Sequence, residues 1–294
     1  MSTLTITGIQ STLHWEAKKA NLQMFEEKIF SISKPTEIVV LPEMFSTGFS
    51  MQPEKLAETM EGETMQWMKQ VASKKKIILT GSLIIKDSYP PGLGGEAYYN
   101  RLVWVLPNGQ LGYYDKRHLF AYADEDQHYT PGEKRLIASV KGWKINLLVC
   151  YDLRFPVWSR QASPRTPLQP RAASSFSGGA RREEQNALEY DVLIYVANWP
   201  EKRVHAWTTL LRARAIENQC YVIGVNRTGE DGNKIHYTGE SMAIDPMGEI
   251  LYHKKDEDDV FTVTLDRSHL EKVREKFPFW KDADVFKIIT TNSE

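Results

Sequence analysis

The sequence contains few cysteines, no long apolar run and almost no net charge. Its two cysteines, Cys150 and Cys220, lie far apart and form neither a disulfide framework nor a CxxC metal motif. No apolar run approaches the roughly 20 residues of a membrane-spanning helix, and residues 1–10 lack the basic start and apolar core of a signal peptide. The formal net charge of -1 favours neither nucleic acid nor an anionic membrane as a partner. We therefore expect a cytoplasmic protein that binds neither.

The sequence does contain the alternation of strands and helices that is typical of an α/β protein. Residues 4–10 alternate like a strand, residues 15–33 carry apolar side chains at helical spacing, and residues 37–41 form a short apolar strand. Because crossover connections are right-handed, these two strands are expected to be neighbours in one sheet. A second β-α-β pattern covers residues 192–225. A chain of 294 residues with this pattern can form one large domain or two smaller ones.

Other elements follow from periodicity and turn residues. The pattern predicts a helix over residues 63–75, a strand over 77–85, hairpins over 98–114 and 237–253, and a strand over 260–265. In the first hairpin the Asn108-Gly109 pair is expected to supply the positive φ angles of a tight turn. Ser268 is expected to cap a short helix near the end of the chain.

One stretch, residues 143–156, joins a buried strand to a polar turn that carries Cys150. A thiol at the tip of a rigid strand is well placed to act as a nucleophile. Most free cysteines are instead small buried hydrophobic residues. On this stretch alone the second interpretation is favoured.

Two more functional side chains, Glu43 and Lys116, also follow strands directly. Sites in α/β sheets gather at the carboxyl ends of strands, although Glu43 could equally be a solvated loop carboxylate, and Arg117 beside Lys116 is expected to be solvated. The three groups complement one another chemically. A buried carboxylate can deprotonate the thiol of Cys150, and an ammonium can stabilise an oxyanion. A cysteine-histidine enzyme is the rival, but no recognisable motif surrounds the nearest histidines, at positions 118, 128, 205 and 236.

Two segments have no apolar periodicity. Residues 122–132 are polar and turn-rich, and can either fold over a site or face solvent. Residues 162–185 shift to Pro, Ser, Ala, Gly and Arg, and are predicted to be an inserted, disordered loop. The alternative is a regulatory or partner-binding arm. We expect deletion of this insertion to leave activity and assembly largely intact.

The motifs around these residues resemble those of the nitrilase superfamily, the carbon-nitrogen hydrolases. The resemblance rests on LPEMFSTGF around Glu43, YDKRHLF around Lys116 and VCYDLRFP around Cys150, in that order. YVANWP, RARAIENQ and YTGESMAIDPMGEIL support it, and it covers nearly the whole chain apart from the insertion. The sequence segments DEDQHYTPG, CYDLRFPVWSR and YVANWPEKR are most similar to those of the bacterial omega-amidase branch.

The resemblance implies a single-domain α/β fold, a four-layer α-β-β-α sandwich, and a homodimer that pairs across helices. It also implies that Glu43 is the general base, Lys116 the oxyanion stabiliser and Cys150 the nucleophile. Glu125 lies where the family often has a second glutamate that orients the lysine or the attacking water. The backbone N–H of Tyr151 would be the second oxyanion donor.

The resemblance further implies hydrolysis of the terminal amide of a small 2-oxo acid, such as 2-oxoglutaramate or 2-oxosuccinamate, through a cysteine thioester. No metal or organic cofactor is expected. The substrate carboxylate calls for an arginine or several N–H donors; Arg154 is a candidate but can be structural, and Trp199 can be a pocket wall or core. Alternatives are another amidase or N-carbamoyl amidase of the superfamily, and a catalytically silent binding protein on this fold.

Overall fold

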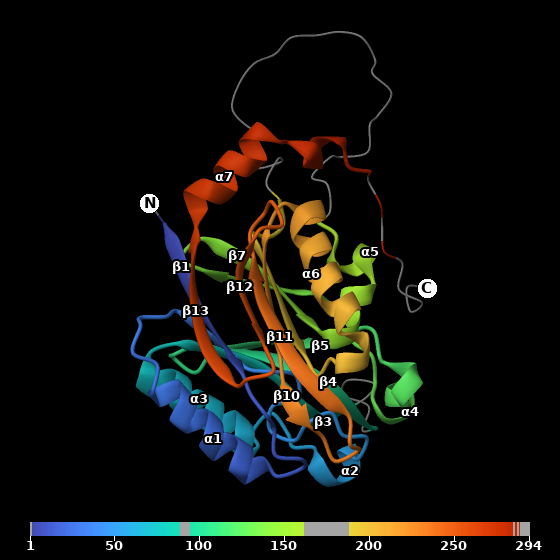
Figure 1. Ribbon diagram of the computed structural model, residues 1–294. Helices are drawn as coiled ribbons and strands as arrows, with labels where there is room; N and C mark the ends of the chain where they lie inside the picture. Colours follow the sequence, from blue (N-terminus) through green and yellow to red (C-terminus); the bar gives the residue numbers. More distant parts are fainter. Residues whose placement is uncertain (1, 89–94, 162–187, 285, 287, 289–294) are drawn as a thin grey trace.

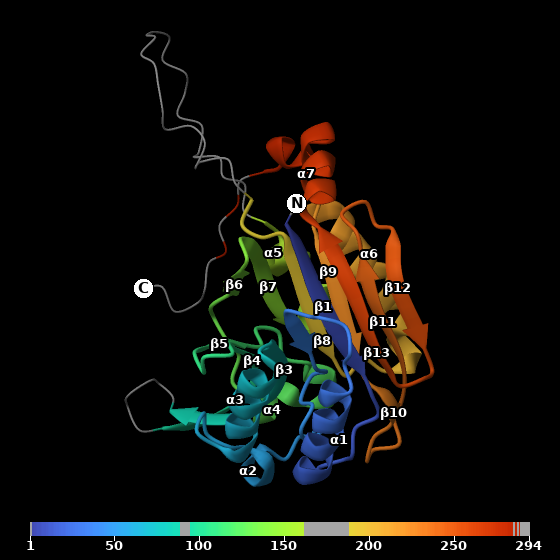
Figure 2. The ribbon, with the colours of Figure 1, turned by 90° about the vertical axis from the view of Figure 1, so that its left-hand side faces the viewer.

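Strands and helices alternate along the chain in the order that the sequence predicts. The computed structural model describes residues 2–88, 95–161, 188–284, 286 and 288. Within these residues, two β-sheets pack face to face and helices cover both outer faces (Figure 1; Figure 2). This is the four-layer α-β-β-α arrangement that the resemblance implies. The predicted insertion at 162–185 lies outside the described residues.

The first sheet has the strand order β13-β1-β2-β3-β4-β5. Strands β1, β2 and β3 run parallel, whereas β13, β4 and β5 are antiparallel to their neighbours. The strands are β1 (Thr3–Gln10), β2 (Ile38–Val40), β3 (Ile78–Ser88), β4 (Glu96–Val105), β5 (Leu111–Asp115) and β13 (Asp259–Asp266). The predicted pairing of the first two strands is confirmed.

The second sheet has the order β10-β11-β9-β8-β7-β6, with β12 also paired to β11. Strands β7, β8 and β9 are its parallel centre. The strands are β6 (Leu136–Val140), β7 (Trp143–Val149), β8 (Val192–Ala197), β9 (Tyr221–Asn226), β10 (Thr228–Glu230), β11 (His236–Ile244) and β12 (Ile250–Lys255).

The longer helices lie on the outside of the two sheets (Figure 2). Helices α1 (Lys18–Phe30) and α3 (Glu63–Lys75) cover the first sheet, and α6 (Val204–Asn218) covers the second. The remaining helices are α2 (Pro53–Leu56), α4 (Glu125–His128), α5 (Pro156–Ser159) and α7 (Arg267–Lys276), with 3-10 turns η1 (Ala121–Ala123), η2 (Cys150–Arg154), η4 (Glu201–Arg203) and η5 (Phe279–Asp282). Among the described residues, no helix combines the length and the apolar character needed to cross a membrane.

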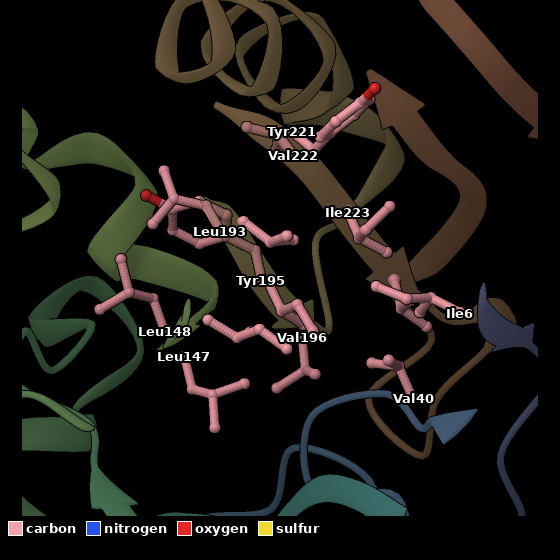
Figure 3. Packing of buried hydrophobic residues seen from close by; sticks show 14 of the residues in the cluster. Ile6, Val40, Leu147, Leu148, Leu193, Tyr195, Val196, Tyr221, Val222 and Ile223 are labelled. Atoms are coloured by element: carbon pink, nitrogen blue, oxygen red, sulfur yellow. The ribbon is translucent and has the colours of Figure 1, made fainter. Parts of the chain in front are cut away.

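The alternating side chains of each strand divide the hydrophobic core into two parts. In β2, Ile38 and Val40 point to the second sheet, whereas Val39 faces the helices. Figure 3 shows Ile6 and Val40 of the first sheet in one cluster with residues of the second, such as Ile223. A strand buried on both faces reads as a continuous apolar run. These short runs were therefore readable from the sequence.

Two local predictions are wrong. In the first hairpin only Gly109 has a positive φ, of 83°, because Leu106 to Gly109 form an ordinary turn whose last residue, Gly109, is left-handed. Helix α7 is capped by Asp266, whose carboxylate accepts the backbone N–H of Ser268 at 2.8 Å. The Asp266 carboxylate, two residues upstream of Ser268, therefore caps the helix in place of the Ser268 hydroxyl that we predicted.

Candidate active site

Glu43 lies just after β2 and is completely buried. Its carboxylate accepts hydrogen bonds from the Lys116 ammonium at 3.0 Å, the Asn100 amide at 2.8 Å and the backbone N–H of Asn198 at 2.8 Å. The Asn198 side chain also donates to the Glu43 carbonyl at 2.6 Å. Because β8 of the second sheet ends just before Asn198, these bonds join the two sheets at the site. Glu43 is therefore not the solvated loop carboxylate that the sequence also allowed.

Lys116 follows β5, and the chain returns to Lys116 at Gly132. The Gly132 N–H donates to the Lys116 carbonyl at 2.9 Å, and the Arg117 guanidinium donates to the Gly132 carbonyl at 3.1 Å. A Cβ on Gly132 would lie 2.1 Å from the Asp115 carbonyl oxygen, so only glycine permits this approach. Arg117 is consequently half-buried rather than solvated.

The segment between Lys116 and Gly132 folds over the site and carries Glu125 at the start of α4. Both oxygens of this buried carboxylate contact the Lys116 ammonium, at 2.9 and 2.8 Å. The backbone N–H of Phe120 donates to Glu125 at 2.6 Å. Asn100 on β4 donates to Glu125 at 3.2 Å as well as to Glu43. One ammonium and one amide thus hold two carboxylates at fixed positions.

Cys150 follows the last residue of β7 and begins η2. Its φ of 43° lies in the left-handed region, which costs a non-glycine residue on the order of 1–3 kcal/mol. Such strain persists only where surrounding contacts impose it, and it is concentrated at functional sites. The thiol lies 3.9 Å from the Asn198 carbonyl oxygen. The residue is partly exposed, unlike the fully buried Cys220.

Asp152 holds the strained turn from inside. Its buried carboxylate accepts the Val149 N–H at 3.0 Å, the His118 N–H at 3.0 Å and the Tyr114 hydroxyl at 2.8 Å. The His118 ring also contacts it at 2.8 Å and stacks on Phe155, 3.8 Å between ring centres. The turn after β7 is thus bonded to the residues on both sides of Lys116.

The charges of the site act on one another strongly because they are buried. Burial raises the pKa of the Cys150 thiol well above its usual range; the charge of Glu43 adds to this rise and the Lys116 ammonium opposes it. Burial alone would lower the pKa of Lys116, but the charges of Glu125 and Glu43 outweigh it and raise that pKa. Burial also raises the pKa of Glu125, against the effect of Lys116. At neutral pH the lysine is therefore charged and the thiol protonated.

A cavity of about 270 Å³ opens onto these groups. Lys116, Cys150 and Tyr151 line it, together with two residues singled out from the sequence, Arg154 and Trp199. The Arg154 guanidinium lies 5.0 Å from the centre of the Trp199 ring. Trp199 is also almost fully buried, so it is both cavity wall and core. Among the described residues, no group of acidic, histidine or cysteine side chains is arranged to hold a metal ion.

The structure brings all the residues predicted from the sequence to one place, but their supporting residues were missed. These are Asn100, Tyr114, Asp152, Asn198 and Arg203. A signal existed for some of them. Asn100 is a polar side chain within an apolar strand, and Asn198 directly follows one. The role of Tyr114 had no such signal, since tyrosine is ordinary in strands.

Comparisons with a family model, with two related proteins and with one solved structure agree. The family model for carbon-nitrogen hydrolase matches residues 3–275. The omega-amidase YafV of Escherichia coli strain K12 is 39% identical over 292 residues, covering 98% of this chain and 100% of that protein. The 2-oxoglutaramate amidase of Bacillus subtilis strain 168 is 30% identical over 281 residues, covering 95% and 96%. The crystal structure of a CN-hydrolase superfamily protein from Xanthomonas campestris, with an arsenic adduct in its active site, is 37% identical, with a TM-score of 0.87 and coverage of 98% and 100%.

Proposed function

This chain belongs to the carbon-nitrogen hydrolase family, and we propose that it hydrolyses the terminal amide of a small 2-oxo acid, such as 2-oxoglutaramate or 2-oxosuccinamate. The products are the 2-oxo dicarboxylate and ammonia. The observation that carries this proposal is the contact of Lys116 with both Glu43 and Glu125 beside the cavity that Cys150 lines. The similarity to an omega-amidase and a 2-oxoglutaramate amidase supports the substrate class.

The first step is the attack of Cys150 on the amide carbonyl. Because burial keeps the thiol protonated, its proton must leave as the sulfur–carbon bond forms, and Glu43 is the base that accepts it. Glu43 already accepts bonds from Lys116, Asn100 and Asn198. These fix its orientation and leave it only small freedom to move away from the thiol.

The oxyanion that results is stabilised by Lys116 and by the backbone N–H of Tyr151. Lys116 lines the cavity, and its close contacts with both oxygens of Glu125 can share a single N–H. One N–H of the ammonium is then available for the substrate oxygen. Tyr151 directly follows the nucleophile in η2 and also lines the cavity. Donors held in advance in a buried site stabilise developing charge at little reorganisation cost.

Collapse of the tetrahedral intermediate breaks the carbon–nitrogen bond. Glu43 returns its proton to the nitrogen, ammonia leaves, and Cys150 remains as a thioester. A water molecule then attacks the thioester while Glu43 takes its proton, and that proton passes to the sulfur as the acid is released. Glu125 is a positioning residue in this scheme, since both of its oxygens contact the Lys116 ammonium.

We assign the substrate carboxylate to the side of the cavity where Arg154 lies over Trp199. A guanidinium that lies over a ring can still direct N–H groups at its edge to a carboxylate, in two parallel bonds. Trp199 then serves as the apolar wall beside the short carbon chain of the substrate.

The direct test is ammonia release by the purified protein from 2-oxoglutaramate, compared with other ω-amides, carbamoyl compounds and nitriles. We expect 2-oxoglutaramate to have the highest kcat/KM and Cys150→Ser to release none. A preference for carbamoyl compounds or for another amide would assign a different reaction of the family. Intact-mass detection of an acyl adduct on Cys150 tests the thioester, and its absence with every amide would favour a silent binding protein.

We also propose a homodimer that pairs across α6. Ile216 and Ile250 are 52% and 46% exposed and line a groove between α6 and the β11–β12 hairpin. Apolar groups gathered on one face favour an interface. Light scattering should report a dimer, and Ile250→Asp should give a monomer; an unchanged mass for this variant would contradict the assignment.

A further inference from the structure

Two arginines at the cavity have no counter-ion among the residues that the structure describes. Every other arginine that the structure describes donates a guanidinium hydrogen bond to a carboxylate or a carbonyl oxygen. The guanidinium groups of Arg154 and Arg203 have no such bond within the described residues, and both line the cavity that contains Cys150. A guanidinium that lines a cavity and has N–H groups without an acceptor is suited to bind an anion.

Aromatic rings hold both guanidinium groups in place. Arg154 lies over Trp199, whereas Arg203 lies 5.0 Å from the centre of the Phe120 ring and 5.9 Å from that of Tyr122. Trp199 links the two arginines, because its indole N–H donates to the Arg203 carbonyl at 2.7 Å. A guanidinium stacked on a ring satisfies its faces and leaves the N–H donors at its edge unused.

The one carboxylate among the cavity residues is already satisfied. Asp231 accepts the backbone N–H groups of Asn233 and Ile235 at 2.8 and 3.0 Å and the Tyr237 hydroxyl at 2.9 Å. These three bonds use most of its acceptor positions, and neither arginine donates to it within the described residues. Half-buried positive charges without a protein partner are costly, and an anionic ligand supplies the missing partner.

We infer that Arg203 is a specificity-determining residue that, together with Arg154, binds the carboxylate of an anionic amide substrate. This inference rests on the proposed function, which it deepens by assigning a second arm of the carboxylate subsite. Arg203 ends η4, which immediately precedes α6, whereas Arg154 ends the turn of the nucleophile. The substrate is thus held from two elements.

Arg203 also contacts the segment that orients the catalytic lysine. The ring on which it lies belongs to Phe120, whose backbone N–H holds Glu125. A carboxylate bound by Arg203 therefore rests against the segment that orients Lys116. Neutral amides of equal length lack this contact, so the subsite discriminates by charge rather than by size.

The test compares Arg203→Gln and Arg203→Lys with the wild type on two amides and one non-reacting probe. The amides are 2-oxoglutaramate and the neutral pentanamide, and the probe is glutarate, whose binding is measured by calorimetry. Because a hydrogen-bonded charge pair is lost, we expect Arg203→Gln to weaken glutarate binding about 10- to 100-fold. Arg203→Gln should also lower kcat/KM, mainly by raising KM. This decrease should be at least about tenfold greater for 2-oxoglutaramate than for pentanamide. Arg203→Lys should be intermediate.

Lys202→Gln is the matched control, since it removes a neighbouring positive charge that is exposed and outside the cavity. It should bind glutarate like the wild type. Equal losses on both amides, or unchanged glutarate binding in Arg203→Gln, would overturn the inference even in an active omega-amidase. Glutarate binding that depends on Arg203 in a protein that releases no ammonia would instead refute the proposed function and leave the anion subsite standing.

Discussion

Tyr114 donates a 2.8 Å hydrogen bond to Asp152 and thereby joins the strand that precedes Lys116 to the turn that carries Cys150. The Tyr114 oxygen also accepts the indole N–H of Trp158 at 2.9 Å and the backbone N–H of Arg117 at 3.1 Å. All its hydrogen-bonding capacity is used in a fully buried position. The hydroxyl therefore links the turn that carries Cys150 to the segment that carries Lys116.

Tyr114→Phe should lower both stability and turnover. Removing the hydroxyl takes the acceptor from the N–H groups of Trp158 and Arg117 and one donor from Asp152. Leaving such groups unpaired costs about 1–3 kcal/mol of the free energy of unfolding. We expect kcat to fall by a larger factor than KM changes. The reason is that the end of β5 and the turn after β7 lose the bond that aligns them. Urea unfolding and steady-state ammonia release measure the two effects. Tyr113→Phe is the control, since that side chain is 48% exposed; equal behaviour of the two variants would refute this role.

Lys116→Ala should be nearly inactive. Loss of one oxyanion donor typically lowers kcat by about 10²- to 10³-fold, and here Glu43 and Glu125 also lose their shared cation. Breaking a buried ion pair in this way costs about 3–5 kcal/mol of stability. Circular dichroism must therefore confirm folding before kcat is compared. Lys134→Ala removes an exposed lysine and should be fully active; a kcat within tenfold of the wild type in Lys116→Ala would contradict the proposed mechanism.

Glu125→Gln should lower kcat while KM changes little. The amide keeps the shape of the side chain but removes the negative charge that helps to keep Lys116 protonated and oriented. Asp124 and Asp126 flank it and are exposed, so Asp124→Asn and Asp126→Asn are matched controls. Both should retain wild-type kinetics. A large loss of kcat in either neighbour, with Glu125→Gln active, would move the assignment along the chain.

The Cys150 thiol should show no thiolate at neutral pH. Its pKa is raised by burial and by Glu43 well above the ordinary value of 9.0, so the protonated form dominates below pH 9. The ultraviolet difference spectrum of wild type minus Cys150→Ser measures the thiolate directly. A thiolate band near pH 7 would exclude concerted deprotonation by Glu43.

The same shift has a consequence for stability. In the unfolded chain the thiol ionises near its ordinary pKa, whereas the folded protein keeps it protonated to higher pH. The stabilising contribution of the protonated Cys150 thiol to the free energy of unfolding is therefore fully present below about pH 9. It is lost as the pH rises through the pKa of the thiol in the folded protein. Denaturation at pH 7 to 10 should show this fall in wild type and not in Cys150→Ser.

Most of the element order could be predicted from the sequence because strands buried on both faces leave continuous apolar runs, and α1 and α3 leave helical spacing. The predicted helix 63–75 coincides with α3 (Glu63–Lys75). The errors concern local competition between groups of similar chemistry. Asp266 rather than Ser268 caps α7, and Gly109 alone takes the left-handed conformation.

The sequence by itself determined which groups stand at strand ends, and so proposed Glu43, Lys116 and Cys150 together. Only the tertiary structure decided what supports them. Asn100 lies opposite Lys116 through strand pairing, and Asp152 meets Tyr114 across the two sheets. Such contacts depend on the register of neighbouring strands and on sheet packing, which periodicity along one chain does not encode. Likewise, only the tertiary structure shows that Arg154 and Arg203 line the cavity with no ion-pair partner in the described part of the chain.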